Sequence, residues 1–350
     1  MSIIDTHEVH HSSRLALVAV ALLLVGTDDA RAQFDSGSDG SDGALNVTAS
    51  MTVTLPDDGI LNYTTVTVAD GATLTFARNG LNTPVYVLAT GDILVSGGGI
   101  IDVSATDATA TPSHLPGIPG PGGFIGGHAG LSGITAGDGH GPGGGKHSSG
   151  AGGDGAFGTR GSGGSLNGQT YGTPLLLGLI GGSGGAGANN VAGGSGGGAL
   201  LLASNTRIQL AGAIRALGSD DSSGITCFCC CGSGGGVRLV APRVEGSGSI
   251  NVFGHATGQG DGRIRIDTRD RSSMNIDAVP DGAMTVGRFL TVFPSALGSL
   301  RIVSVAGTMV SAAATRCEPS EGARQAVFAV AGLGSRAIAF CQPLTCRAAP

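Results

Sequence analysis

The density of glycine is the feature that most restricts how this chain folds. Of its 350 residues 66 are glycine, and 35 of these lie between positions 117 and 198. Glycine loses more backbone entropy on folding than other residues and brings no side chain to a core. The chain also has no tryptophan, three tyrosines and a single lysine, Lys146. The glycine-rich segment must therefore be ordered by packing of its own backbone or by contact with the neighbouring parts of the chain.

The N-terminus has the pattern of a secretory signal peptide. Residues 15–25 (LALVAVALLLV) are apolar without interruption, follow Arg14, and precede a small-x-small cleavage pattern at residues 30–32 (ARA). A membrane-spanning helix needs about 20 apolar residues, and this run has eleven. We therefore predict a secreted or cell-surface bacterial protein that loses residues 1–32, begins near Gln33 and has no transmembrane helix.

The charge of the exported chain argues against two classes of partner. The formal net charge is −6, and removal of residues 1–32 takes away four acidic residues and two arginines, which leaves −4. Nucleic acids and anionic membranes are recognised by clustered lysine and arginine. The sequence shows no such cluster, so we expect no nucleic-acid partner and look instead to a component of the cell envelope or extracellular matrix.

The composition divides the exported chain into four parts. Residues 33–106 and residues 199–293 are rich in Val, Ile, Leu and Thr, broken by small-residue turns, as is typical of short strands. Residues 107–198 form the glycine-rich insertion between them, and residues 294–350 form a terminal strand and an atypical tail. No segment after the signal shows a sustained 3.6-residue pattern, so we expect very little helix.

One unit recurs in both strand-rich parts: a short strand, a small-residue turn and a second short strand. Copies occupy residues 66–76, 93–103, 207–216 and 244–252. The last two are each preceded by Ser-Gly-Gly-Gly and an apolar strand, at residues 195–203 and 233–241, 38 residues apart. Internal similarity at a period of 20–50 residues is typical of a solenoid.

These repeats favour an all-β right-handed parallel β-helix with a long glycine-rich insertion. One coil cannot bury its own apolar positions, so coils must stack and form a continuous aliphatic column. Alternation such as Ile101, Asp102, Val103 suits one face inward and one outward. The competing fold is an antiparallel sandwich, which would require more hairpin turns and a more aromatic core.

The export signal, the repeats at residues 73–76 and 93–103, and the closing segment 260–267 (GDGRIRID) resemble secreted glycine-rich parallel β-helix proteins of bacteria, often described as adhesin-like. This resemblance covers most of the exported chain and implies architecture, not activity. Residues 181–198 (GGSGGAGANNVAGGSGGG) also resemble, in composition, the repeats of mycobacterial PE-PGRS proteins. The helical N-terminal domain of that family is absent, so its biology is not carried over.

The glycine tract has two interpretations. Gly/Ser-rich sequence behaves as flexible coil, whereas extended helices with three residues per turn can pack side by side through backbone hydrogen bonds. Several catalytic patterns also occur in it. Residues 182–187 spell a dinucleotide fingerprint without a following helix or acidic residue, residues 193–197 spell a nucleophile elbow by composition alone, and Lys146 is followed by His147, not by Ser or Thr as a phosphate loop requires. We reject all three.

Calcium is the cofactor for which some residues are suited. Oxygen-rich turns bind hard cations, and the candidate ligands are Asp35, Asp39, Asp42 and Asp154. Aspartate and glycine are also ordinary turn residues, so solvated turns are the favoured interpretation. Histidines occur in turn or glycine-rich sequence at His114, His128, His140, His147 and His255. Of these, His140 and His147 are the candidates for sharing a transition metal.

Acid–base chemistry would require charged residues gathered on one exposed face. The candidates are Asp102, Arg215, Arg263, Arg265 and Asp267. Their spacing does not bring them together, and exposed charges on outward strand positions explain them equally well. Clustering in one groove would favour an exported polysaccharide lyase or glycoside hydrolase, and scattering would favour a non-enzymatic protein.

The seven cysteines are candidates for disulfides, because exported proteins meet an oxidising environment. They are Cys227, Cys229, Cys230, Cys231, Cys317, Cys341 and Cys346. Seven leaves one unpaired, connectivity cannot be deduced from spacing, and the cluster at 227–231 is also a candidate soft-metal site. Residues 314–350 abandon the repeat pattern, either as a cap or through a frame change in the gene. We expect a non-enzymatic structural or adhesive protein.

Overall fold

The computed structural model describes residues 34–109, 114–161, 164–222, 230–254 and 260–293, together with six short strands between residues 302 and 347. These residues contain strands and no helix. Within them, accordingly, no helix is long and apolar enough to cross a membrane. The chain forms two compact units, one ending at Phe293 and the other beginning at Pro294.

The first unit is built from parallel strands on three faces. The first face contains β3 (Ile60–Tyr63), β6 (Val85–Ala89), β11 (Ala199–Ser204), β14 (Gly236–Glu245), β16 (Arg263–Asp270) and β18 (Met284–Gly287). The second contains β1 (Ala44–Val47), β4 (Thr65–Val68), β7 (Ile93–Val95), β12 (Arg207–Leu210) and the end of β14. The third contains β2 (Met51–Thr54), β5 (Thr73–Ala77), β8 (Ile100–Asp102), β13 (Ala213–Arg215), β15 (Ser249–Asn251) and β17 (Asp277–Val279).

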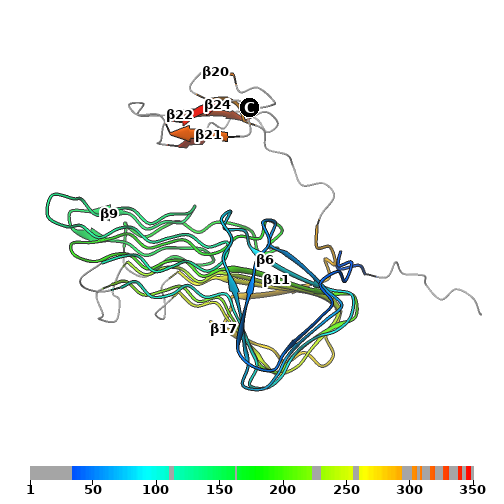
Figure 1. Cartoon of the computed structure of the whole chain (residues 1–350). Helices are drawn as coiled ribbons and strands as arrows, with labels where there is room; N and C mark the ends of the chain where they lie inside the picture. Colours follow the sequence, from blue (N-terminus) through cyan, green and yellow to red (C-terminus); the bar gives the residue numbers. More distant parts are fainter. Residues whose placement is uncertain are drawn as a thin grey trace, which may run out of the picture. The chain divides into compact units, whose positions relative to one another are not determined.

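The chain passes through the three faces in order, and the strands of one coil pair with those of the next. Val66 lies opposite Ile93, and Leu74 opposite Ile101, so both faces advance by the same 27 residues. Ile214 continues the second of these columns between Ile101 and Ile250. The repeats identified in the sequence are therefore the strands that pair in register. Figure 1 shows the turns stacked around a triangular outline, a nearly closed solenoid.

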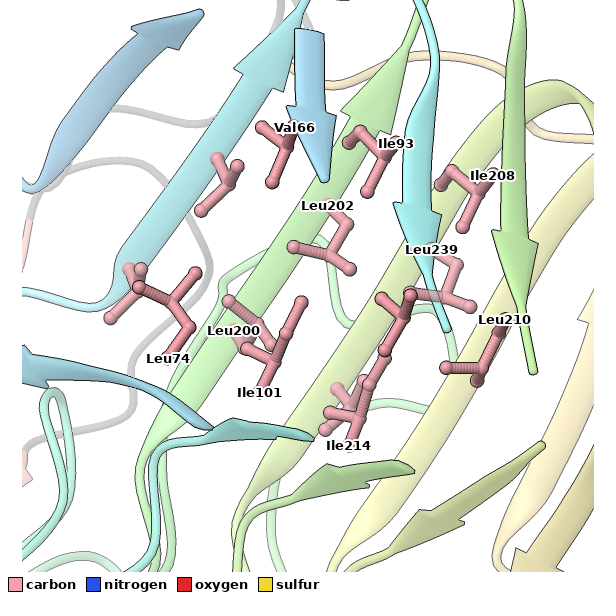
Figure 2. Packing of buried hydrophobic residues seen from close by; sticks show 14 of the residues in the cluster. Val66, Leu74, Ile93, Ile101, Leu200, Leu202, Ile208, Leu210, Ile214 and Leu239 are labelled. Atoms are coloured by element: carbon pink, nitrogen blue, oxygen red, sulfur yellow. The ribbon is translucent and has the colours of Figure 1, made fainter. Parts of the chain in front are cut away.

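The core is the aliphatic column enclosed by the three faces. Figure 2 shows side chains such as Val66, Ile93, Leu202 and Ile214 directed into it from different strands. Alternate residues of a strand point to opposite sides, which explains the buried positions in β4 and β5. Burying one such side chain contributes roughly 1.5–3 kcal/mol, so stacking of turns is the main source of stability.

The glycine-rich tract is packed, not a flexible loop. Its segments extend to one side of the triangle (Figure 1) and are joined by backbone hydrogen bonds at a step of three residues. Phe124, Gly127 and Gly130 donate in turn to the carbonyls of Gly182, Gly185 and Ala188. This step matches an extended helix with three residues per turn, so the second interpretation of the tract is the one observed. A short hairpin of β9 (His147–Ser148) and β10 (Ala151–Gly152) interrupts it. We call this assembly the glycine bundle; it also includes residues 216–222 and 230–235.

Close approach between backbones explains why the bundle needs glycine. A Cβ atom added at Gly126 would overlap the carbonyl of Gly193, and one added at Gly187 would overlap the carbonyl of His128. Serine is accepted where its hydroxyl bonds to backbone. The Ser195 Oγ accepts from the Gly126 amide at 3.0 Å and donates to the Gly117 carbonyl at 2.6 Å.

The outer side of the first face is also covered. Residues 288–293, which we call the strap, run from the end of β18 back across this face. Val292 packs there with Phe34, Leu88 and Leu201 in a second apolar cluster, and the rings of Tyr86 and Phe293 lie 5.4 Å apart. Both the start of the described chain and the strap are thus anchored to the outside of the solenoid.

The second unit is antiparallel. Its strands are β19 (Ile302–Val305), β20 (Thr308–Met309), β21 (Arg316–Pro319), β22 (Ala326–Val330), β23 (Ile338–Phe340) and β24 (Leu344–Arg347). β22 pairs with β19 and β23, and β21 pairs with β24. Its strand pairing therefore differs from the parallel pairing of the solenoid.

Candidate functional site

The candidate acid–base residues lie on two different sheets. Asp102 and Arg215 occupy neighbouring positions on the third face. Arg263, Arg265 and Asp267 belong to β16 on the first face. Their spacing in the sequence does not bring them together, and the structure does not gather them in one groove.

Two of these residues, Arg265 and Asp267, belong to a hydrogen-bonded network within the structure. Asp267 Oδ1 accepts from Arg265 Nη2 at 2.6 Å, and Asp267 Oδ2 accepts from Arg238 Nη2 at 3.0 Å. Arg238 also donates to the carbonyls of Phe289 and Thr291, both in the strap. The side chains of Arg238 and Asp267 are each 1% exposed. This network fastens the strap to the first face and leaves Asp267 no access to a substrate.

The remaining member, Arg263, borders a cavity of about 370 Å³ where the glycine bundle meets the solenoid. We call this cavity the junction pocket. Asp261, Asp281, Thr159 and Thr285 also line it. The Arg263 guanidinium donates to the carbonyl of Tyr171 at 3.1 Å and lies 5.6 Å from the centre of the Phe157 ring. Its charge is therefore held in place from the bundle side.

Asp261 joins the two parts of the unit. The Thr159 hydroxyl donates to Asp261 Oδ2 at 3.1 Å and accepts from the Asp261 amide at 2.8 Å. Burial raises the pKa of Asp261, and the bonds from Thr159 and the Gly254 amide oppose the rise. Asp261 Oδ1 is buried without a hydrogen-bond partner among the described residues. A carboxyl group of this kind beside an arginine can bind a polar ligand or transfer a proton.

Asp154, one of the calcium candidates, lies inside the glycine bundle. It is fully buried, its Oδ1 accepts from the Cys231 amide at 3.1 Å, and its own amide donates to Asn167 Oδ1 at 2.9 Å. Burial raises its pKa to about 6, and the charge of Asp221 acts in the same direction. The folded bundle thus disfavours the charged form of Asp154 relative to the unfolded chain.

The other three calcium candidates form turns near the start of the solenoid. Asp35 accepts from the Gly37 amide at 2.9 Å, Asp39 from the Ser41 amide at 2.9 Å, and Asp42 from the Asn62 amide at 2.6 Å. The bonds of Asp35 and Asp39, to amides two residues along, are those that aspartate makes in ordinary turns, whereas Asp42 bonds to a residue of β3. In the described part of the chain no three acidic, histidine or cysteine side chains are grouped to hold a metal.

The other motifs of the glycine tract are also accounted for by local contacts. Ser195 is buried in the bundle, so it cannot act as a nucleophile toward an external substrate. Lys146 pairs with Asp138 at 3.1 Å, with both side chains at least half exposed. His147 lies against the carbonyl of Gly187 and His128 against that of Ala129. His255 lies outside the described residues.

The cysteine cluster borders the buried acid. Cys231 is disulfide-bonded, and Cys230 is a buried thiol. Cys227, Cys229 and Cys341 lie outside the described residues. Cys317 and Cys346 face each other in the pairing of β21 with β24.

Three residues of these sites had no signal in the sequence. Arg238 is an isolated charge in an apolar strand, and Thr159 lies in the glycine tract, 102 residues from Asp261. Asp261 lies between two glycines in the closing segment GDGRIRID, a pattern that is typical of a turn. Only the strand register and the packing of the bundle bring them to their partners.

Comparison with known proteins adds no assignment. No protein-family model matches the chain, and neither a curated protein nor a solved structure is significantly similar to it.

Proposed function

We propose that this is an exported, non-enzymatic structural or adhesive protein of the bacterial cell surface or extracellular matrix. Its solenoid would be a right-handed parallel β-helix, because crossover connections between parallel strands are right-handed in about 98% of cases. The helix would be a stiff support, and the glycine bundle a plate that projects from it. The partner would be a component of the envelope or matrix.

The observation that carries this proposal is the distribution of the charged residues. Asp102 and Arg215 lie on the third face, whereas Arg265 and Asp267 are held in the buried network of the first. The serine of the apparent nucleophile elbow bonds to backbone. Chemistry-bearing side chains are thus used to hold segments together, which is what a structural protein requires.

The junction pocket supports one alternative, an exported polysaccharide lyase or glycoside hydrolase. It contains two carboxylates, Asp261 and Asp281, beside Arg263. A carboxyl group with a raised pKa is suited to general acid catalysis. In a screen of polysaccharides, activity that is lost in Asp261→Asn and Asp281→Asn would establish the enzyme and overturn the structural role.

Cell fractionation combined with protease treatment of intact cells tests the main proposal. We expect the protein to stay with the cell or matrix fraction and to be cleaved by added protease while a cytoplasmic marker stays intact. Quantitative release as a soluble monomer would contradict a structural or adhesive role at the surface. Retention in the cytoplasm would contradict export itself.

A further inference from the structure

Most arginines of the first unit have a partner. Residues 34–293 contain eleven arginines, and within the described part of the chain the side chains of three of them, Arg215, Arg271 and Arg288, have neither a hydrogen bond nor an ion pair. Arg215 lies on the third face, opposite Asp102 in the neighbouring strand. Arg271 and Arg288 line one small pocket. Two unpaired cations at one place require an explanation that strand formation does not supply.

Strand register brings these two arginines together. β16 and β18 are parallel, with Asp267 opposite Gly287. Arg271 directly follows β16, and Arg288 directly follows β18. Continued past Gly287, this register places Arg288 opposite Thr268, three residues before Arg271. The two arginines therefore lie near the same edge of the sheet although 17 positions separate them in the chain.

The pocket between them has room for one chemical group. Its volume is about 200 Å³, and Thr268, Val286 and Gly287 complete its lining. That is smaller than the roughly 300–1,000 Å³ of a pocket for a drug-sized ligand. Both arginines are exposed, so a group carried on a polymer can reach them from solvent.

The nearby carboxylates are engaged elsewhere. Asp267 is held by Arg238 and Arg265. Asp270 accepts from the amide and the hydroxyl of Ser272 at 3.0 and 2.8 Å. The pocket is thus lined by two arginines and by no carboxylate, in a chain whose formal net charge is negative.

We propose that Arg271 and Arg288 bind the carboxylate of an acidic polysaccharide, with one uronate unit in the pocket. The planar guanidinium group matches a carboxylate with two parallel hydrogen bonds, which a lysine cannot make. A dense polyanion such as nucleic acid would be repelled by the net charge of −4 of the exported chain, whereas a polysaccharide has one charge per sugar, so a single uronate can occupy the pocket. This assignment rests on the proposed extracellular role and names its ligand.

Binding of the exported chain to polygalacturonate tests the proposal, with fully methyl-esterified polygalacturonate as the matched ligand control. We expect binding to the acid polymer that weakens with added salt and is lost on the ester. The double variant R271Q/R288Q should bind roughly tenfold or more weakly, since each lost hydrogen bond to a charged group is worth at least a factor of ten. Arg215→Gln, which removes the third unpaired arginine, should bind like the wild type.

The proposal is overturned if the double variant binds as tightly as the wild type, or if neither polymer is bound. Equal affinity for poly-L-glutamate or duplex DNA would also overturn it, because charge alone would then suffice. Unfolding temperatures of all variants should match, since the substituted side chains are exposed and have no partners. If the protein stays on the cell surface but does not bind uronate, the ligand proposal fails and the proposed extracellular role stands.

Discussion

Arg238 and Asp267 form an ion pair of 3.0 Å in which each side chain is only 1% exposed. They lie on the outer side of the first face, where most solenoid positions would meet water. The strap makes the difference, because Arg238 also bonds to two of its carbonyls and the Phe289 amide donates to Asp267 at 3.0 Å. The pair is therefore a clamp between the solenoid and residues 288–293.

Loss of one member of this pair should be costly. Asp267→Ala leaves Arg238 buried without its counter-ion, and breaking a buried pair in this way costs about 3–5 kcal/mol. We expect a loss of that size in the free energy of unfolding measured with denaturant. Asp277→Ala, at an exposed strand position, should change it by less than about 0.5 kcal/mol. If both variants unfold alike, the clamp contributes nothing to stability.

Replacing both members should separate charge from packing. Well-packed apolar residues in place of a buried ion pair are often neutral or stabilising. We therefore expect Arg238→Met combined with Asp267→Leu to recover much of the stability lost in Asp267→Ala. Greater protease sensitivity near Phe293 in the double variant would show that the strap is held by the hydrogen bonds of Arg238 to its carbonyls.

Glycines of the bundle should be far less replaceable than those of the solenoid turns. An alanine at Gly126 meets the carbonyls of Gly193 and Gly194, whereas one at Gly97 meets open space. Overpacking typically costs 1–3 kcal/mol, so Gly126→Ala should lower the unfolding free energy by about that amount. Gly97→Ala should leave it nearly unchanged. Equal tolerance at both positions would mean that the bundle is looser than its hydrogen bonds indicate.

The solenoid could be predicted because its information is local and repeated. Strand alternation in the copies at residues 66–76 and 93–103 decides which side chains point inward, and the constant spacing decides which strands pair. The stacking of Val66 on Ile93 follows from that spacing alone. The structure of the glycine bundle cannot be predicted in this way, because glycine carries no such alternation and because flexible coil and packed backbone have the same composition.

The sites could not be predicted because they depend on contacts between distant segments. The Thr159 hydroxyl reaches Asp261 only after the bundle folds back against β16. Arg238 looks like an interruption in an apolar strand until the strap covers it. Arg271 and Arg288 are ordinary exposed charges in the sequence, and only the folded chain brings them to one pocket.

The buried acid of the bundle should make stability depend on pH. Asp154 has a pKa of about 6 in the folded chain against 3.8 as its ordinary value. The folded state therefore favours the neutral form, so this contribution is complete below pH 3.8 and is lost as pH rises through about 6. A difference of that size corresponds to about 3 kcal/mol. Asp154→Asn, which cannot ionise, should remove this dependence.

Unfolding of Asp154→Asn and the wild type between pH 3.5 and 7.5 gives the comparison. The variant should gain stability relative to the wild type as the pH rises, mostly between pH 4 and 6. Asp57→Asn, at an exposed turn position, controls for the loss of a carboxylate. A constant difference between Asp154→Asn and the wild type across this range would show that the acid is not the titrating group.

The tail offers a prediction about disulfide connectivity. Cys317 lies directly opposite Cys346 in the antiparallel pair of β21 and β24. Opposite residues in such a pair have Cα atoms about 4.5–5.5 Å apart, which falls within the range of a disulfide. We therefore expect a Cys317–Cys346 bond in the exported protein.

Peptide mapping without reduction, after alkylation of thiols, identifies the bond as a linked pair of peptides. Cys346→Ser should release Cys317 for alkylation and leave the disulfide of Cys231 intact, since the two lie in different compact units. Linkage of Cys317 to Cys341 instead would show that β21 and β24 do not pair as described. Because a bond that closes a loop of about 30 residues is worth roughly 3–4 kcal/mol, its loss should also make the second unit markedly more sensitive to protease.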